Sequence, residues 1–188
     1  FSPQLMERYN LVPQGISAEM IADKWEIPRS ELDEIGLRSH QLAARATEEG
    51  RFEREIIPFT VNGDTYVTDQ GIRPDTSLEK LAELKPAFKE DGKITAGNSS
   101  QVSDGAAAVL LMTREKADEL GLKPRARVLD QTTVGVDPVL MLTGPIPATK
   151  KLLDRNGMKL DDIDLIEINE AFASVIAAWR RELEPDMD

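Results

Sequence analysis

Residues 97–112 read GNSSQVSDGAAAVLLM, a polar loop that runs directly into seven apolar residues, 106–112. The apolar run is too short and too evenly apolar for a surface helix, because such a helix carries polar side chains on one face. It therefore predicts a strand covered on both faces, as in the sheet of an α/β protein. A strand of this kind would support the polar loop before it from below.

The second half of the chain continues this alternation. Residues 125–135 and 161–169 predict two more strands, and residues 148–157 and 170–184 predict helices. We also expect a short helix capped by Thr113 after the first strand. Three strands, each followed by a helix, indicate an α/β sheet with crossover connections.

The first half of the chain reads as mainly helical. We expect one helix capped by Ser17 and a longer amphipathic helix capped by Ser30 that ends at Gly50. Two short extended runs in residues 55–69 flank the sequence NGD, which predicts a hairpin. A further short helix is expected after Thr76 or Ser77 and before Pro86, with either residue able to cap it.

Composition restricts the classes of function. The formal charge of −11 arises from 23 basic and 34 acidic residues, and this balance repels a phosphate backbone, so we expect no nucleic-acid partner. The sequence has no cysteine, which excludes a disulfide scaffold and a cysteine nucleophile within these residues. We find neither a membrane-length apolar stretch nor a signal peptide, and we expect a cytoplasmic protein without membrane contact.

A second polar motif lies in residues 165–175, LIEINEAFASV. Asn169 and Glu170 stand at the carboxyl end of a predicted strand, and open α/β sheets bind their ligands at this edge. The same two side chains could instead cap the helix that follows. The motif is thus either a helix cap or part of a ligand site.

Two stretches together resemble the thiolase family. Residues 169–173, NEAFA, resemble its signature, and residues 95–112 resemble its pantetheine loop with the strand after it. Four further segments occur in family order: QGISAEMIADKW at 14–25, LRSHQLAARA at 37–46, LKPAFKEDGKITAGN at 84–98 and LTGPIPATKKLL at 142–153. The resemblance therefore covers nearly the whole chain.

The resemblance implies an incomplete thiolase-like α/β fold in three parts. Residues 1–103 match most of the loop domain, residues 104–123 the last part of the N-terminal domain, and residues 124–188 the first half of the C-terminal domain. The family's two catalytic cysteines and its catalytic histidine have no match in this sequence. We therefore expect an internal segment that is inactive by itself and, lacking neighbours for its apolar runs, prone to aggregate.

The implied activity is acyl transfer between coenzyme A and an acyl-CoA, by cleavage of a 3-ketoacyl-CoA or by Claisen condensation. Coenzyme A and acyl-CoA are the implied substrates, no metal is implied, and the complete protein is expected to be a homodimer or homotetramer. Asn169 matches the family asparagine that holds a water beside the thioester oxygen. Glu170 matches a structural anchor rather than a base.

The resemblance also implies four binding residues. Ser100 matches the serine that hydrogen-bonds the pantetheine arm, and Arg73 matches an arginine near the adenine. Met141 and Phe172 match apolar residues beside the arm. Without the resemblance, Arg73 reads as a solvated loop residue and the other two as ordinary core. His40, the one histidine, does not match the family's catalytic histidine and is expected at the surface of its helix.

Two alternative functions remain at this stage. The chain could belong to a non-catalytic thiolase-like protein that binds acyl-CoA or lipid, or that serves as a partner subunit. It could also be a generic α/β interaction domain, which would not be retained on immobilised coenzyme A. Cysteines and a Gly-His-Pro turn in the flanking sequence would indicate the enzyme.

Overall fold

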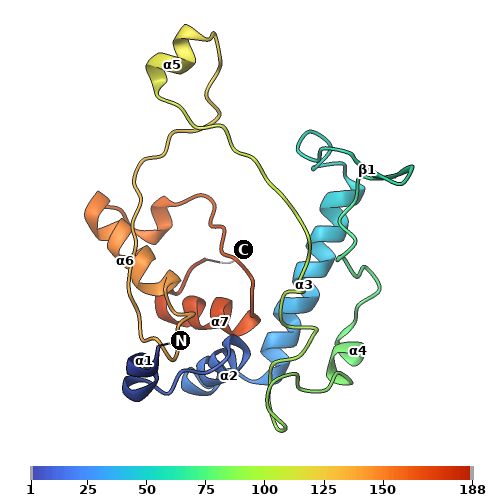
Figure 1. Cartoon of the computed structure of the whole chain (residues 1–188), viewed down its shortest axis with the longest axis vertical. Helices are drawn as coiled ribbons and strands as arrows, with labels where there is room; N and C mark the ends of the chain where they lie inside the picture. Colours follow the sequence, from blue (N-terminus) through green and yellow to red (C-terminus); the bar gives the residue numbers. More distant parts are fainter. Residues whose placement is uncertain (1, 187–188) are drawn as a thin grey trace.

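The computed structural model describes residues 2–186, and its centre is a group of helices. Helices α2 (Gln14–Lys24) and α3 (Arg29–Glu48) both pack against α7 (Ala173–Leu183). Helix α6 (Pro145–Asn156) covers another part of α7, and the short α4 (Leu78–Ala82) lies against α3. Segments from the two ends of the sequence therefore form one helical body (Figure 1).

The core lies where these helices meet, and α7 contributes the largest share of it. Its buried apolar residues include Val175, Ala178 and Trp179, which follow each other at helical spacing, and Ala177. The remaining buried side chains of this core are Ala18, Ile21, Ala22, Ile27, Leu32, Ile94, Ile146, Phe172 and Ala173.

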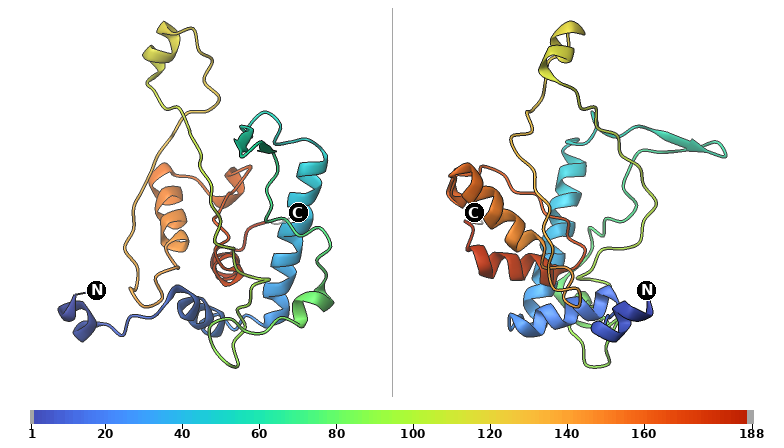
Figure 2. Two further views of the ribbon diagram at one scale, coloured as in Figure 1. Left: turned by 45° about the vertical axis from the view of Figure 1, so that its right-hand side comes forward. Right: turned by 60° about the vertical axis from the view of Figure 1, so that its left-hand side comes forward.

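Several elements stand away from the body. Residues 102–129 form a long excursion with α5 (Arg114–Glu119) at its tip, and Figures 1 and 2 show this tip far from the other helices. The hairpin of β1 (Phe59–Val61) and β2 (Asp64–Tyr66) projects in a different direction. Helix α1 (Pro3–Arg8) and the 3-10 turn η1 (Leu160–Asp162) complete the described elements.

The structure confirms the features that local sequence decides. In the hairpin turn Asn62 and Gly63 have φ of 52° and 94°, as a type I′ turn requires. Ser77 caps α4 and Thr113 caps α5, each accepting a hydrogen bond from the backbone N–H three residues on. Gly157 ends α6 in a left-handed conformation, with φ of 63°.

The three predicted strands are wrong. Residues 106–112, 125–135 and 163–169 form no strand, and residues 161–162 belong to η1. The predicted burial of the first segment is also wrong, since Val109, Leu110 and Leu111 are 80%, 78% and 74% exposed. A strand exists only through the ladder of hydrogen bonds to a neighbour. Within residues 2–186 the hairpin is the one sheet, and these segments have no partner strand.

Two predicted helix starts are also wrong. Helix α2 begins at Gln14, so Ser17 lies inside it, fully buried, and its hydroxyl donates to the carbonyl oxygen of Leu140 (2.7 Å). Helix α3 begins at Arg29 after Pro28, one residue before the expected cap Ser30. Proline can stand just ahead of a first turn because the N–H groups there have no partner within the helix.

Candidate active site

The polar loop and the NEAFA motif lie side by side, although 71 positions separate them in sequence. The backbone N–H of Ser100 donates to the carbonyl oxygen of Ala171 (2.9 Å), and the N–H of Ala173 donates to that of Asn98 (2.9 Å). Between these bonds Ser99 and Phe172 form an isolated antiparallel bridge. The backbone itself therefore holds Ser100 beside the segment that carries Asn169.

Ser100 and Asn169 line the same cavity. Its volume is about 420 Å³, and its walls are Ser100 and residues 166–170. Both residues are exposed, so the hydroxyl-bearing and amide-bearing residues open on one depression that solvent can enter. One ligand can therefore contact both of them.

A second cavity lies on the other side of Ser100. Its volume is about 490 Å³, and Ser100 and Glu170 line both cavities, so the two adjoin. The hydroxyl of Ser39 on α3 donates to a carboxylate oxygen of Glu170 (2.6 Å). This bond ties the NEAFA motif to α3, as an anchoring role for Glu170 requires.

Arg73 lines the second cavity together with Ser100. Its side chain is exposed, and Nη1 donates to the carbonyl oxygen of Gln70 (3.0 Å), within its own segment. The backbone N–H of Arg73 donates to Nδ1 of His40 on α3 (3.2 Å). His40 is half-buried and lines the same cavity.

Met141 and Phe172 line neither cavity. Phe172 is 8% exposed and packs edge-on against Phe88, with ring centroids 6.0 Å apart. Met141 is half-buried and follows a tight turn, in which its N–H donates to the carbonyl oxygen of Asp137 (2.8 Å). The structure therefore places Phe172 in the core, and the tunnel-lining role of both residues stays a prediction.

The turn before Met141 has its own electrostatic support. The backbone N–H groups of Leu140 and Val139 donate to the Asp137 carboxylate (2.9 and 2.8 Å) and hold the pKa of that carboxyl below its ordinary value. Ser17 then binds the carbonyl of Leu140 from α2. The position of Met141 is thus fixed by an acidic turn and one buried hydroxyl.

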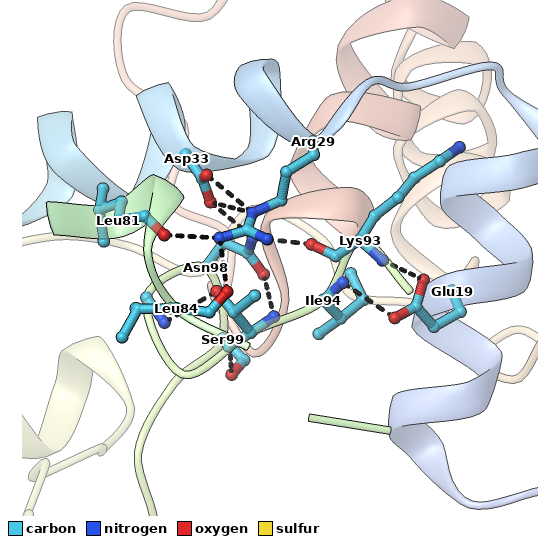
Figure 3. A network of polar contacts seen from close by, with 11 residues as sticks. Glu19, Arg29, Asp33, Leu81, Leu84, Lys93, Ile94, Asn98 and Ser99 are labelled. Atoms are coloured by element: carbon cyan, nitrogen blue, oxygen red, sulfur yellow. Dashed lines mark hydrogen bonds and ion pairs between the residues drawn. The ribbon is translucent and has the colours of Figure 1, made fainter. Parts of the chain in front are cut away.

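Sequence reasoning missed a buried polar network that holds the serine loop (Figure 3). Asn98 is 3% exposed, and its Nδ2 donates to Asp33 Oδ1 (2.8 Å) and to the carbonyl oxygen of Lys93 (3.0 Å). Its Oδ1 accepts from the N–H of Thr95 (2.9 Å). One amide therefore closes the loop on itself and joins it to α3.

Helices α2 and α3 supply the acidic partners of this network. Asp33 also accepts from Nε of Arg29 (2.7 and 2.9 Å), whose Nη2 donates to the carbonyl oxygen of Leu81 (2.5 Å). Glu19 is 2% exposed and accepts from the N–H groups of Lys93 and Ile94 (2.8 and 2.9 Å). An acidic residue on the buried face of each helix was the available sequence signal.

Two family models match this chain. The family model described as "Thiolase, N-terminal domain" matches residues 1–115, and "Thiolase, C-terminal domain" matches residues 122–188. The chain belongs to the thiolase family. The resemblance of the NEAFA motif and the serine loop to this family is thereby confirmed.

Curated thiolases match the chain over most of its length. An acetyl-CoA acetyltransferase of Syntrophomonas wolfei is 49% identical over 183 residues, covering 95% of this chain and 46% of that protein. A steroid 3-ketoacyl-CoA thiolase of Mycobacterium tuberculosis is 45% identical over 187 residues, covering 98% of this chain and 46% of that protein. The chain thus spans about half the length of these curated thiolases.

Solved thiolases share the arrangement of the elements. The acetyl-CoA acetyltransferase of Bacillus anthracis matches with a TM-score of 0.90 at 45% identity, over 93% of this chain and 45% of that one. Human mitochondrial 3-ketoacyl-CoA thiolase, in a complex with CoA, matches with a TM-score of 0.90 at 40% identity, over 94% and 45%. The expected fold class, a partial thiolase fold, is confirmed.

No helix within residues 2–186 of this thiolase chain has the length and apolar character needed to cross a bilayer. The histidine, aspartate and glutamate side chains of the same residues do not form a group of three that could hold a metal ion.

Proposed function

We propose that the protein containing this chain transfers an acyl group between coenzyme A and acyl-CoA, as a 3-ketoacyl-CoA thiolase or acetyl-CoA acetyltransferase. The observation that carries the proposal is the cavity shared by Ser100 and Asn169. Backbone pairing across 71 positions brings these two residues together. A thioester at the end of a long arm needs one group that binds the arm and another that acts on the thioester.

Asn169 acts on the reacting end of the substrate in this proposal. Its carboxamide orients a water toward the thioester oxygen, where negative charge develops as an enolate forms. A neutral amide suits this task, because a carboxylate there would repel the developing charge. Glu170 anchors the motif through Ser39 and does not take a proton.

Ser100 and Arg73 hold the arm and the nucleotide. Ser100 lines both cavities, and in this proposal its hydroxyl hydrogen-bonds the pantetheine arm. Arg73 lines the second cavity, and in this proposal its planar cation stacks on the adenine. Met141 and Phe172 line neither cavity, and their place beside the arm rests on the family resemblance alone.

The acyl-accepting thiol lies outside these residues, because the sequence contains no cysteine. Transfer then takes place in two steps: the thiolate attacks the carbonyl and releases one thiol or carbanion, and a second nucleophile takes the acyl group. A cytoplasmic homo-oligomer is part of the same proposal. Domain boundaries after residues 103 and 123 likewise stay predictions.

The test uses the product of the complete open reading frame that encodes this chain. We expect it to cleave acetoacetyl-CoA in the presence of CoA, with loss of the enolate absorbance of the substrate. Binding of CoA without cleavage would instead indicate the non-catalytic thiolase-like binder or partner subunit. Failure to bind CoA at all would contradict the proposal and favour a generic interaction domain.

A further inference from the structure

His40 is tied to Arg73 in a way that the proposed reaction does not use. The segment 69–75 is organised as a turn, with the N–H of Gly71 donating to Asp69 Oδ1 (2.7 Å). It reaches α3 through the hydrogen bond from the N–H of Arg73 to His40 Nδ1 (3.2 Å). The imidazole therefore fixes the backbone of the residue proposed to meet the nucleotide.

The opposite side of the same segment touches the serine loop. The Gln101 side chain lies against Gly71, since a Cβ added at Gly71 would overlap its amide nitrogen. Gln101 directly follows Ser100, and Gly71, His40 and Arg73 all line the second cavity. The segment thus lies between α3 and the loop that holds the arm.

The contact depends on the charge of the ring. Nδ1 accepts a hydrogen bond only in neutral imidazole, in which Nε2 carries the hydrogen, whereas both nitrogens are donors in the imidazolium form. A protonated His40 would turn an N–H toward the N–H of Arg73. The charged residues that share its cavity are Arg73 on the turn and Glu170 ahead of α7, and Glu170 already accepts from Ser39.

We propose that His40 is a positioning residue: its neutral imidazole docks the Arg73 turn onto α3 and so presents the nucleotide-binding side of the cavity to coenzyme A. This inference rests on the proposed function, because it assigns the nucleotide end of CoA to the Arg73 side of the site.

The test compares the Kd for CoA with the Kd for pantetheine in two variants of the protein that the complete open reading frame encodes. His40→Leu removes the acceptor, whereas His40→Asn keeps an acceptor oxygen near the place of Nδ1. We expect His40→Leu to raise the Kd for CoA about three- to tenfold, the usual effect of losing one hydrogen bond. The Kd for pantetheine, which lacks the nucleotide, should stay within about twofold.

His40→Asn should restore the affinity for CoA. An equal loss for CoA and pantetheine in His40→Leu would overturn the inference, because it would indicate a general structural role. Unchanged CoA affinity in His40→Leu would overturn it as well. If the wild type bound no CoA, the proposed function would fail first, and the inference with it.

Discussion

Asn98 uses every polar atom available to it in fixing the serine loop. Its side chain binds Asp33, the carbonyl of Lys93 and the N–H of Thr95, and its own carbonyl accepts from Ala173. A buried amide with all partners satisfied has one favoured orientation. The loop is therefore held in place before any ligand arrives, which lowers the ordering cost of binding.

Replacing Ser100 with alanine should affect binding alone. The bond from Ser100 to Ala171 uses the backbone N–H, so Ser100→Ala keeps the loop in place and removes only the hydroxyl. In the complete enzyme we expect KM for an acyl-CoA to rise about three- to tenfold, with kcat nearly unchanged. Steady-state kinetics provide the measurement.

Ser99 offers a matched control for this prediction. Its hydroxyl donates to the carbonyl oxygen of Thr95 (2.7 Å), so Ser99→Ala should lower the free energy of unfolding by about 1 kcal/mol. Ser100→Ala should leave that free energy unchanged. A loss of stability in Ser100→Ala as large as in Ser99→Ala would assign the Ser100 hydroxyl to the fold and not to the ligand.

Helix α3 is the platform of the site. Asp33, Gly36 and His40 follow each other at spacings of three and four residues and so share one face of the helix. Asp33 binds Asn98 and His40 binds Arg73, while Gly36 leaves room for the chain, because a Cβ there would overlap the carbonyl oxygen of Gly97. One helical face thus positions both the serine loop and the Arg73 turn.

Removing the carboxylate of Asp33 should destabilise this platform. Asp33→Ala removes the carboxylate partner of the largely buried Arg29 and one of the two acceptors of the buried Asn98 Nδ2, and we expect a loss of about 3 kcal/mol in the free energy of unfolding. Urea denaturation of the complete protein measures it. Glu34→Ala, at an exposed position of the same helix, should change stability by less than about 0.5 kcal/mol. Similar losses in both variants would contradict the prediction.

Acid should loosen the contact between residue 130 and α6. Hydrogen bonds from Arg155, and then from Asn156, lower the pKa of the Asp130 carboxyl from its ordinary 3.8. A carboxyl whose pKa is lowered by folding stabilises the fold above its unfolded pKa, and this stabilisation disappears as the pH falls through the folded pKa. The ion pair should therefore contribute at neutral pH and be lost at a pH below the ordinary pKa.

The measurement is the urea midpoint of wild type and Asp130→Asn as a function of pH. The wild type should have the higher midpoint at neutral pH, and the two midpoints should converge as the pH falls below about 4. A difference between the midpoints that grows on acidification would have the wrong sign and would contradict the prediction.

Helix caps and the hairpin turn were predictable from the sequence, whereas the pairing of strands far apart in the sequence was not. The caps Ser77 and Thr113, the stop Gly157 and the Asn62–Gly63 turn depend on neighbouring residues, so a short window of sequence decides them. The strands depend on distant partners, and the extended segments have none within residues 2–186. An apolar run indicates that a segment is suited to burial, but it does not show that a partner strand is present.

In the candidate site, too, the residues could be predicted from the sequence and the long-range contacts between them could not. Resemblance to the family identified Ser100, Asn169 and Arg73, and the structure places Ser100 in a cavity with each of the others. The bonds of Asp33 to Asn98 and of His40 to Arg73 span 65 and 33 positions, and no local pattern announces such contacts. The chemical groups were predictable, whereas the contacts that orient them required the fold.

On the scale of the molecule, exposed apolar side chains are the main feature. Val102, Val109, Leu110 and Leu111 in the long excursion, and Leu165 before α7, are all at least 74% exposed. Exposed apolar area costs about 25 cal/mol per Å² compared with buried area. The 188-residue polypeptide expressed alone should therefore bind a hydrophobic dye such as ANS and sediment as aggregates.

A double substitution gives this prediction a control. Leu110→Lys with Leu111→Lys should reduce dye binding and aggregation, because both side chains are exposed and their replacement creates no cavity. A monomeric sedimentation profile with a cooperative thermal transition for the unmodified polypeptide would contradict the prediction.

The reaction of the complete protein tests the central claim, that Asn169 acts on the thioester that Ser100 helps to hold. The measurement compares acyl transfer from the thioester to the enzyme with the condensation step, in wild type and in Asn169→Ala. The account predicts that condensation falls by about two orders of magnitude, as when one oxyanion-stabilising group is removed, while acyl transfer falls much less. An equal loss in both steps would contradict it.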